Sequence, residues 1–196
     1  MSDQNLTPDQ AFDKLMKGNQ RFVNGWPDRP NQSAYRRREV AGGQHPFAVI
    51  LSCSDSRVPP EIVFDQGLGD LFVMRVAGNV LSGVVIGSIE YAVEHLQVPL
   101  VMVLGHDSCG AVTEAVKGVH LLGHLGALIE VLRPAVDIAK AHGGDVVSHA
   151  IDANVRISVT QLKESQPIVA PLVNDGKVKI VGARYHLESG TVNLLE

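Results

Sequence analysis

Three residues of the types that bind transition metals stand at the ends of two apolar stretches. Cys53 follows the stretch FAVILS at residues 47–52, and His106 follows LVMVLG at residues 100–105, with Cys109 three positions later. They include both cysteines of the chain. Catalytic zinc is held by three protein ligands of this kind with a fourth position open, whereas structural zinc usually takes four. The pattern therefore favours a catalytic zinc ion bound by Cys53, His106 and Cys109.

Asp55 and Arg57 follow the first of these cysteines in the sequence CSDSR. Side chains two positions apart in an extended segment project on the same side, so the carboxylate and the guanidinium can form a bidentate pair with a fixed direction. Two other interpretations stay open. The cysteines could be buried core residues, and Asp55 with Arg57 could be an ordinary ion pair in a turn. The placement of all these groups at the end of one apolar stretch favours the metal site.

The strands that must position these residues are predicted by continuous apolar stretches. Such stretches, at residues 47–52, 71–76 and 100–104, are typical of strands covered on both faces, as in a parallel sheet. A further strand is predicted at residues 177–181, and an edge hairpin at residues 183–195 with its turn at 188–190. Ligands of open α/β sheets bind outside the carboxyl ends of the strands, and the predicted metal ligands Cys53, His106 and Cys109 stand at such ends.

Helical periodicity separates these strands. Helices are predicted at residues 7–23, 84–96, 111–116, 125–141 and 146–162, the fourth of them interrupted or restarted at Pro134. A short helix is predicted to begin at Pro60, and residues 25–43 are expected to form an extended surface connection. The expected fold is α/β, with a mainly parallel central sheet, flanking helices and a C-terminal antiparallel edge hairpin.

The first helix has Thr7 as its N-cap, Pro8 in its first turn and an apolar stripe of Phe12, Leu15, Met16 and Phe22. The later helices are expected to cover the sheet and to leave no place for this stripe. The helix is therefore predicted to be an N-terminal arm, residues 1–25, that packs on a neighbouring subunit.

Length and composition limit the classes of protein. A chain of 196 residues is expected to form a single domain. A formal net charge of −4 without a large basic block argues against nucleic acid as a partner. No apolar stretch approaches the roughly 20 residues that cross a bilayer, so no membrane association is expected. The N-terminal sequence MSDQNLTPDQ lacks the pattern of a secretion signal, and a cytoplasmic location is expected.

The combination of CSDSR with GHDSCG at residues 105–110 resembles the β class of carbonic anhydrases. The resemblance continues through GNQRF at residues 18–22, DLFVMRVAGN at residues 70–79 and SIEYAVEHL at residues 88–96. It covers most of the chain, from the first helix to the C-terminal hairpin.

This resemblance implies zinc-dependent reversible hydration of carbon dioxide to bicarbonate and a proton by zinc-bound hydroxide. One Zn²⁺ ion per chain would be held by Cys53, His106 and Cys109, and Asp55 with Arg57 would be the catalytic dyad. Four residues are expected at the substrate pocket: Gln44, Phe72, Gly110 and Tyr91, the last coming from a neighbouring subunit. The expected assembly is a homodimer or a homotetramer.

The sequence departs from part of the family just before Cys53. Some members carry a tryptophan three residues before the first ligand cysteine and a glycine directly before it, which with an arginine like Arg75 form a pocket for non-catalytic bicarbonate. Here these positions hold Ile50 and Ser52. An aliphatic side chain cannot donate the hydrogen bond of an indole, so the pocket is not expected and Asp55 should stay paired with Arg57 near neutral pH.

Two other functions remain open from the sequence. Relatives on the same fold hydrolyse carbonyl sulfide or carbon disulfide with similar ligands, and a non-enzymatic zinc-binding protein could use the two thiols structurally. The presence of Asp55, Arg57 and Gln44 favours an enzyme. His120 and His124 are four apart, but without the glutamate of a His-Glu-x-x-His motif they are predicted to be surface residues rather than a second metal site.

Overall fold

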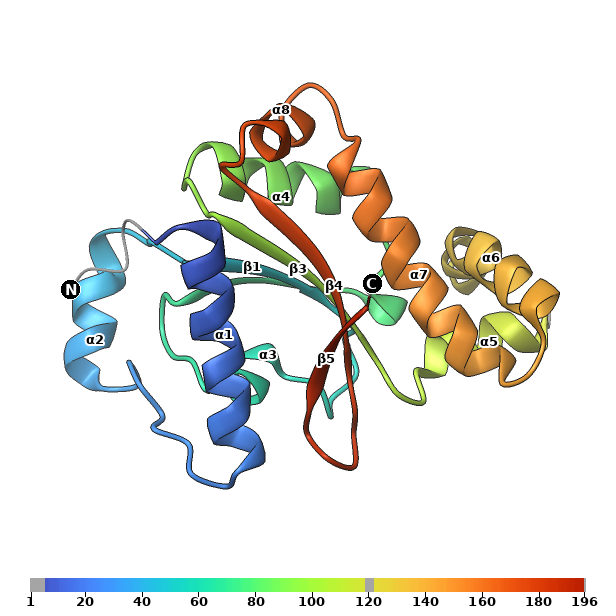
Figure 1. Cartoon of the computed structure of the whole chain (residues 1–196), viewed down its shortest axis with the longest axis horizontal. Helices are drawn as coiled ribbons and strands as arrows, with labels where there is room; N and C mark the ends of the chain where they lie inside the picture. The colour runs from blue at the N-terminus through green and yellow to red at the C-terminus, as the bar shows by residue number, and fades with distance from the viewer. Residues whose placement is uncertain (1–5, 119–121, 196) are drawn as a thin grey trace.

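A single sheet organises the computed structural model, which describes residues 6–118 and 122–195 (Figure 1). Its strands are β1 (Ala48–Ser52), β2 (Leu71–Arg75), β3 (Leu100–His106), β4 (Lys179–Tyr185) and β5 (Val192–Leu195). Their order is β2-β1-β3-β4-β5. The first four strands pair in parallel, and β5 pairs with β4 in antiparallel fashion. The predicted α/β fold with a mainly parallel sheet and an antiparallel edge hairpin is confirmed.

The helices that accompany this sheet are α1 (Pro8–Val23), α2 (Ala34–Glu39), α3 (Pro60–Val63), α4 (Gly83–Glu94), α5 (Gly110–Lys117), α6 (Leu125–His142), α7 (Val146–Lys163) and α8 (Val169–Asn174). Among the helices of the described residues, none combines the length and the apolar character that crossing a membrane would require.

The helices differ from the predicted elements in three details. The predicted surface connection at residues 25–43 contains α2, which begins because the Ser33 side chain accepts a hydrogen bond from the backbone N–H of Arg36. α8 was not predicted. α6 continues through Pro134 without a break, because apolar residues on both sides of the proline, Leu132 and Val136 among them, are buried in one cluster with α5 and α7.

The two faces of the sheet are covered by different helices. Successive side chains of a strand point to opposite faces. Val49 and Leu51 of β1 therefore pack with residues of α4, α7 and α8, whereas Ala48 and Ile50 pack with residues of α1 and α3. Figure 1 shows α1 crossing the sheet and α5, α6 and α7 gathered beside it.

The apolar stripe of α1 packs on the sheet of its own chain. Leu15 is fully buried in the cluster that contains Ile50, and Phe12, Met16 and Phe22 pack against the same cluster. The expectation that the later helices leave no place for this stripe is wrong, because α4, α7 and α8 all lie on the opposite face and leave this one for α1. Packing of α1 on a neighbouring subunit stays a prediction. The predicted N-cap is confirmed, since Thr7 forms a capping box with Gln10.

Close packing of α7 fixes the strands that lead to the predicted site. A side chain at Gly105 of β3 or at Gly182 of β4 would place its Cβ 2.7 Å from a methyl group of Val155 in α7. Glycine is therefore required at both positions for the helix to lie this near the sheet. β3 continues two residues further than predicted, so that His106 is its last residue, paired in register with Tyr185.

Candidate metal and catalytic site

The carboxyl ends of β1 and β3 bring together Cys53, His106 and Cys109. Their ligand atoms all lie within 4.8 Å of one another, and the two sulfur atoms are 4.0 Å apart. All three residues are buried. Cys53 directly follows β1, His106 ends β3, and Cys109 is the residue before α5. No other group of three His, Cys, Asp or Glu side chains converges in this way within residues 6–118 and 122–195.

The two nitrogens of the His106 imidazole differ in their hydrogen bonding. Its Nδ1 donates a hydrogen bond to the main-chain carbonyl of Asp107 at 2.8 Å, which leaves Nε2 as the atom with a lone pair. Nε2 is fully buried and has no hydrogen-bond partner among the described residues. A buried polar atom without a partner is rare and needs an explanation. A metal ligand with its second nitrogen held by a carbonyl fits this arrangement, and two sulfurs with one nitrogen are a donor set that suits zinc.

The surroundings of Cys53 favour a thiolate. The Cys109 thiol, as a hydrogen-bond donor, lowers the pKa of Cys53 from its ordinary value, although burial acts in the opposite direction. The backbone N–H of Gly78 also donates to the Cys53 sulfur, at 3.3 Å. Gly78 has a φ of +68°, a conformation that glycine adopts without strain. A negatively charged sulfur in a buried cluster is suited to a cation.

Asp55 and Arg57 form the predicted bidentate pair. Arg57 Nε donates to Asp55 Oδ1 at 2.9 Å and Arg57 Nη2 to Oδ2 at 2.7 Å, while the backbone N–H of Arg57 also donates to Oδ1 at 2.9 Å. These hydrogen bonds hold the pKa of Asp55 well below its usual range. Asp55 Oδ2 lies 3.9 Å from His106 Nε2. The ionised carboxylate therefore faces the ligand cluster.

Arg75 supports the loop that carries this pair. Its Nε donates to the main-chain carbonyl of Cys53 at 3.1 Å, and its Nη2 donates to the main-chain carbonyl of Asp55. Arg75 ends β2 and is paired in register with Ser52, so the neighbouring strand places its guanidinium beside the loop.

Of the four predicted substrate residues, one lies beside the ligand cluster and three lie away from it. Gly110 begins α5 directly after Cys109. Gln44 is exposed and precedes β1, whereas Cys53 follows that strand, whose five residues alone span about 16 Å at roughly 3.3 Å per residue. Phe72 lies near the start of β2, with its ring centroid 6.3 Å from that of Tyr91. Within one chain, Gln44, Phe72 and Tyr91 are therefore not brought to the ligand cluster.

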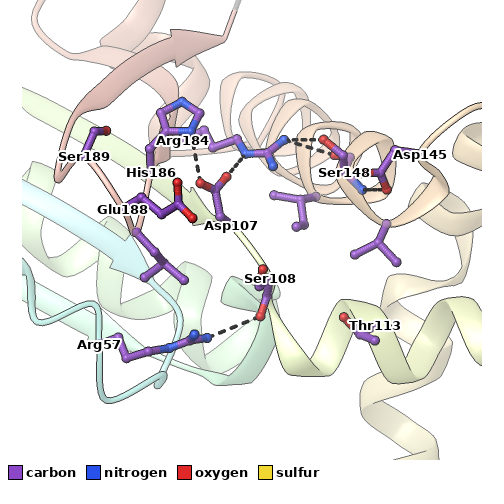
Figure 2. A pocket seen from close by; sticks show the side chains of 13 residues that line it. Arg57, Asp107, Ser108, Thr113, Asp145, Ser148, Arg184, His186, Glu188 and Ser189 are labelled. Atoms are coloured by element: carbon purple, nitrogen blue, oxygen red, sulfur yellow. Dashed lines mark hydrogen bonds and ion pairs between the residues drawn. The ribbon is translucent and has the colours of Figure 1, made fainter.

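A cavity of about 1020 Å³ adjoins the site and includes Arg57 in its wall (Figure 2). Other polar residues of the wall come from the segment after β3, from α7 and from the hairpin of β4 and β5: Asp107, Ser108, Ser148, Arg184, His186 and Glu188. Asp107 accepts hydrogen bonds from Arg184 and His186. Sequence reasoning missed these contacts, although the position of Asp107 between two predicted ligands is a signal. His124 is exposed, and His120 lies outside the described residues.

Comparisons with known proteins agree with this arrangement. The family described as "Carbonic anhydrase" matches residues 48–192. "Carbonic anhydrase 2" of Mycobacterium tuberculosis is 43% identical over 190 residues, which cover 95% of this chain and 92% of the relative. "Carbonic anhydrase" of Mycolicibacterium smegmatis is 42% identical over 194 residues, covering 97% and 94%.

A solved structure shares the fold. The β-carbonic anhydrase of Coccomyxa, determined in complex with acetazolamide, is 30% identical, with a TM-score of 0.74 over 92% of this chain and 84% of that one. The family match covers most of the chain and includes Cys53, Asp55, Arg57, His106 and Cys109. From the match, the sequence identities and the shared fold, we conclude that the chain belongs to the β-carbonic anhydrases, a family of enzymes.

Proposed function

We propose that this chain catalyses the reversible hydration of carbon dioxide to bicarbonate and a proton, with one zinc ion held by Cys53, His106 and Cys109. The observation that carries the proposal is the buried Nε2 of His106, which has no hydrogen-bond partner among the residues that the structure describes. It lies beside two sulfur atoms, with the Asp55 carboxylate 3.9 Å away. A zinc ion in this place would lower the pKa of a water molecule from 15.7 towards about 7 and so supply a nucleophile at neutral pH.

Asp55 is proposed to orient the attacking oxygen. An ionised carboxylate can only accept hydrogen bonds. By accepting a hydrogen bond from the nucleophile, Asp55 would direct an oxygen lone pair towards carbon dioxide, which is a gain from positioning. Arg57 keeps the carboxylate ionised and fixes its direction through two hydrogen bonds.

A second copy of the chain is proposed to complete the substrate pocket. Gln44, Phe72 and Tyr91 lie away from the ligand cluster of their own chain, and the Tyr91 side chain is partly exposed. α4, the helix that carries Tyr91, also presents Val84, which is 83% exposed, and Gly87, where an added Cβ would meet no atom within 4 Å. An apolar helix surface with an open glycine allows close approach of another subunit. The proposed assembly is a homodimer or a homotetramer.

The decisive experiment measures zinc content and the rate of carbon dioxide hydration on one sample. The expected result is about one zinc per chain together with hydration activity. Cys53→Ser, His106→Ala and Cys109→Ser should each remove the metal, because a site with three protein ligands cannot lose one. His124→Ala, which alters an exposed histidine, is the control and should keep it. Full zinc retention in any of the three ligand variants would contradict the assignment of the ligands. A faster reaction with carbonyl sulfide than with carbon dioxide would identify carbonyl sulfide as the preferred substrate.

A further inference from the structure

All four hydrogen-bonding groups of Asp107 have partners. Its backbone N–H donates to the Tyr185 carbonyl at 3.1 Å, and its own carbonyl accepts from His106 Nδ1 at 2.8 Å. Its carboxylate accepts from Arg184 Nε at Oδ1, at 2.7 Å, and from His186 Nδ1 at Oδ2, at 3.1 Å. Figure 2 shows the carboxylate lying between these two side chains. Asp107 is thus fixed on both its main chain and its side chain.

The two partners of the carboxylate are themselves held by other elements. Arg184 Nη1 donates to the side chains of Ser148, at 2.8 Å, and Asp152, at 3.1 Å, both on α7. Asn193 of β5 contacts His186 Nε2 at 3.3 Å. Since the carboxylate of Asp107 accepts from His186 Nδ1, the neutral ring presents Nε2 as an acceptor for the Asn193 amide. Asp107 is therefore anchored through β4, α7 and β5 together.

The segment between the two ligands from the β3 end is short. Only Asp107 and Ser108 separate His106 from Cys109, and Ser108 has a φ of +52°, in the left-handed region that few residues other than glycine adopt. The Asp107 carbonyl holds His106 Nδ1, so a displacement of the Asp107 peptide would turn the His106 ring. The same displacement would move Cys109, because only Ser108 stands between Asp107 and Cys109. Fixing Asp107 fixes both ligands.

We propose that Asp107, held by Arg184 and His186, is a positioning residue for the metal site: it sets the orientation of the His106 ring and the spacing between His106 and Cys109. This inference rests on the proposed function, because it presupposes a metal on these ligands. Groups that orient metal ligands in this way typically contribute 10- to 100-fold to metal affinity or activity.

The test compares Asp107→Asn with Glu188→Gln. The asparagine keeps the shape of the side chain but removes the negative charge that holds Arg184. Its NH₂ group either faces Arg184, where the hydrogen bond is lost, or faces His186, whose ring must then take its other tautomer to accept it. Glu188 lies in the wall of the same cavity and makes none of the contacts to Asp107 described above, so its amide variant is a matched control. Zinc affinity, measured by competition with a chelator, should fall by about tenfold or more in Asp107→Asn and stay unchanged in Glu188→Gln.

A second variant and a spectrum separate positioning from folding. Arg184→Lys keeps the charge but cannot reproduce the geometry of the guanidinium contacts, and it should weaken zinc binding in the same direction. The visible spectrum of the cobalt-substituted protein should change in both variants, whereas a merely structural role would leave it as in the parent.

The outcomes separate this inference from the function it rests on. If the parent binds zinc and both variants match its zinc affinity and cobalt spectrum, the inference is overturned and the proposed function stands. If Asp107→Asn does not fold, the zinc affinity and the cobalt spectrum of Arg184→Lys test the inference in its place. A parent that binds no zinc would instead overturn the proposed function.

Discussion

The carboxylate of Asp55 is bound at both oxygens by Arg57, and its Oδ2 lies 3.9 Å from Nε2 of His106. The ion pair and the ligand cluster are thus one site, in which the guanidinium determines where the carboxylate points. The loop that carries the pair is held at two carbonyls by Arg75.

Asp55→Ala should keep zinc and lose most of the hydration activity. The substitution removes the acceptor that orients the nucleophile but none of the three ligands. A misplaced reacting group typically costs about a hundredfold in rate, which is the expected order of the loss. Zinc content by mass spectrometry and the initial rate of hydration, measured on the same sample, check both parts. A rate near that of the parent would show that Asp55 has no part in catalysis.

Two inactive variants should restore activity when their subunits are mixed. Gln44→Ala and Asp55→Ala are each expected to be inactive. If Gln44 serves the site of a neighbouring subunit, then in a mixed dimer the zinc site of the Gln44→Ala chain receives an intact Gln44 from its partner. Random mixing after dissociation should then recover about a quarter of the parental rate, since half the dimers are mixed and one of their two sites is complete.

The control for this experiment mixes each variant with itself. These samples should stay inactive. Mixed samples that remain inactive, although subunit exchange is shown by mass spectrometry, would mean that Gln44 acts in its own chain or not at all.

Asp65 should make stability depend on pH. Burial raises its pKa, but Arg21 and the backbone N–H groups of Asp28 and Arg29 lower it by more, so the pKa of the folded state lies below the ordinary value. A depressed carboxyl pKa contributes stability above the unfolded value of about 3.9, and this contribution is lost as the pH falls through the folded pKa. Asp65→Asn should therefore destabilise the protein by about 1.5–3 kcal/mol at pH 7 and by clearly less at pH 3.

Urea unfolding at the two pH values measures this difference. Asp13→Asn, on the exposed side of α1, is the control and should show little effect at either pH. An equal loss of stability at pH 7 and pH 3 for Asp65→Asn would rule out a contribution from its ionisation.

Activity should fall smoothly with acid, without a steep cooperative loss. The positions that form a bicarbonate pocket in some family members hold Ile50 and Ser52, both fully buried here. Arg75 already uses its Nε and Nη2 for the carbonyls of Cys53 and Asp55. These contacts, together with the hydrogen bonds that Arg57 donates to Asp55, favour the state in which Asp55 stays paired with Arg57 over a second state in which it leaves. Rates measured from pH 6 to pH 9 should fit the loss of a single proton, and a crystal structure near neutral pH with bicarbonate beside Arg75 would contradict this.

The ligand cluster could be predicted from sequence because each strand end is marked locally. A continuous apolar stretch stops at Cys53 and another at His106, and the parallel sheet then brings their ends together. The capping box of Thr7 is likewise a pattern within four residues. Local patterns of this kind are readable without knowing which helix covers which face.

The face of the sheet on which α1 packs and the contacts of Asp107 could not be predicted in the same way. The choice of face for α1 depends on where α4, α7 and α8 lie, which is decided by the whole topology. Asp107 and Arg184 are 77 positions apart, and the arginine stands in a strand with no motif around it. The distance between Gln44 and Cys53 follows from the direction of β1, since the two residues lie at opposite ends of that strand. Matching single residues to a family motif does not show this.

Asn19 joins α1 to α3 and to the hairpin of β4 and β5. Its Nδ2 donates to the carbonyls of Val63 and Gly190, and its Oδ1 accepts from the backbone N–H of Val192 at the start of β5. Because this buried amide has all three bonds only when helix and hairpin are both in place, the first and last elements should open together as one cooperative unit. In native-state hydrogen exchange, the amides of α1 and β5 should then share a common opening free energy, and Asn19→Ala should let each exchange at its own, faster rate.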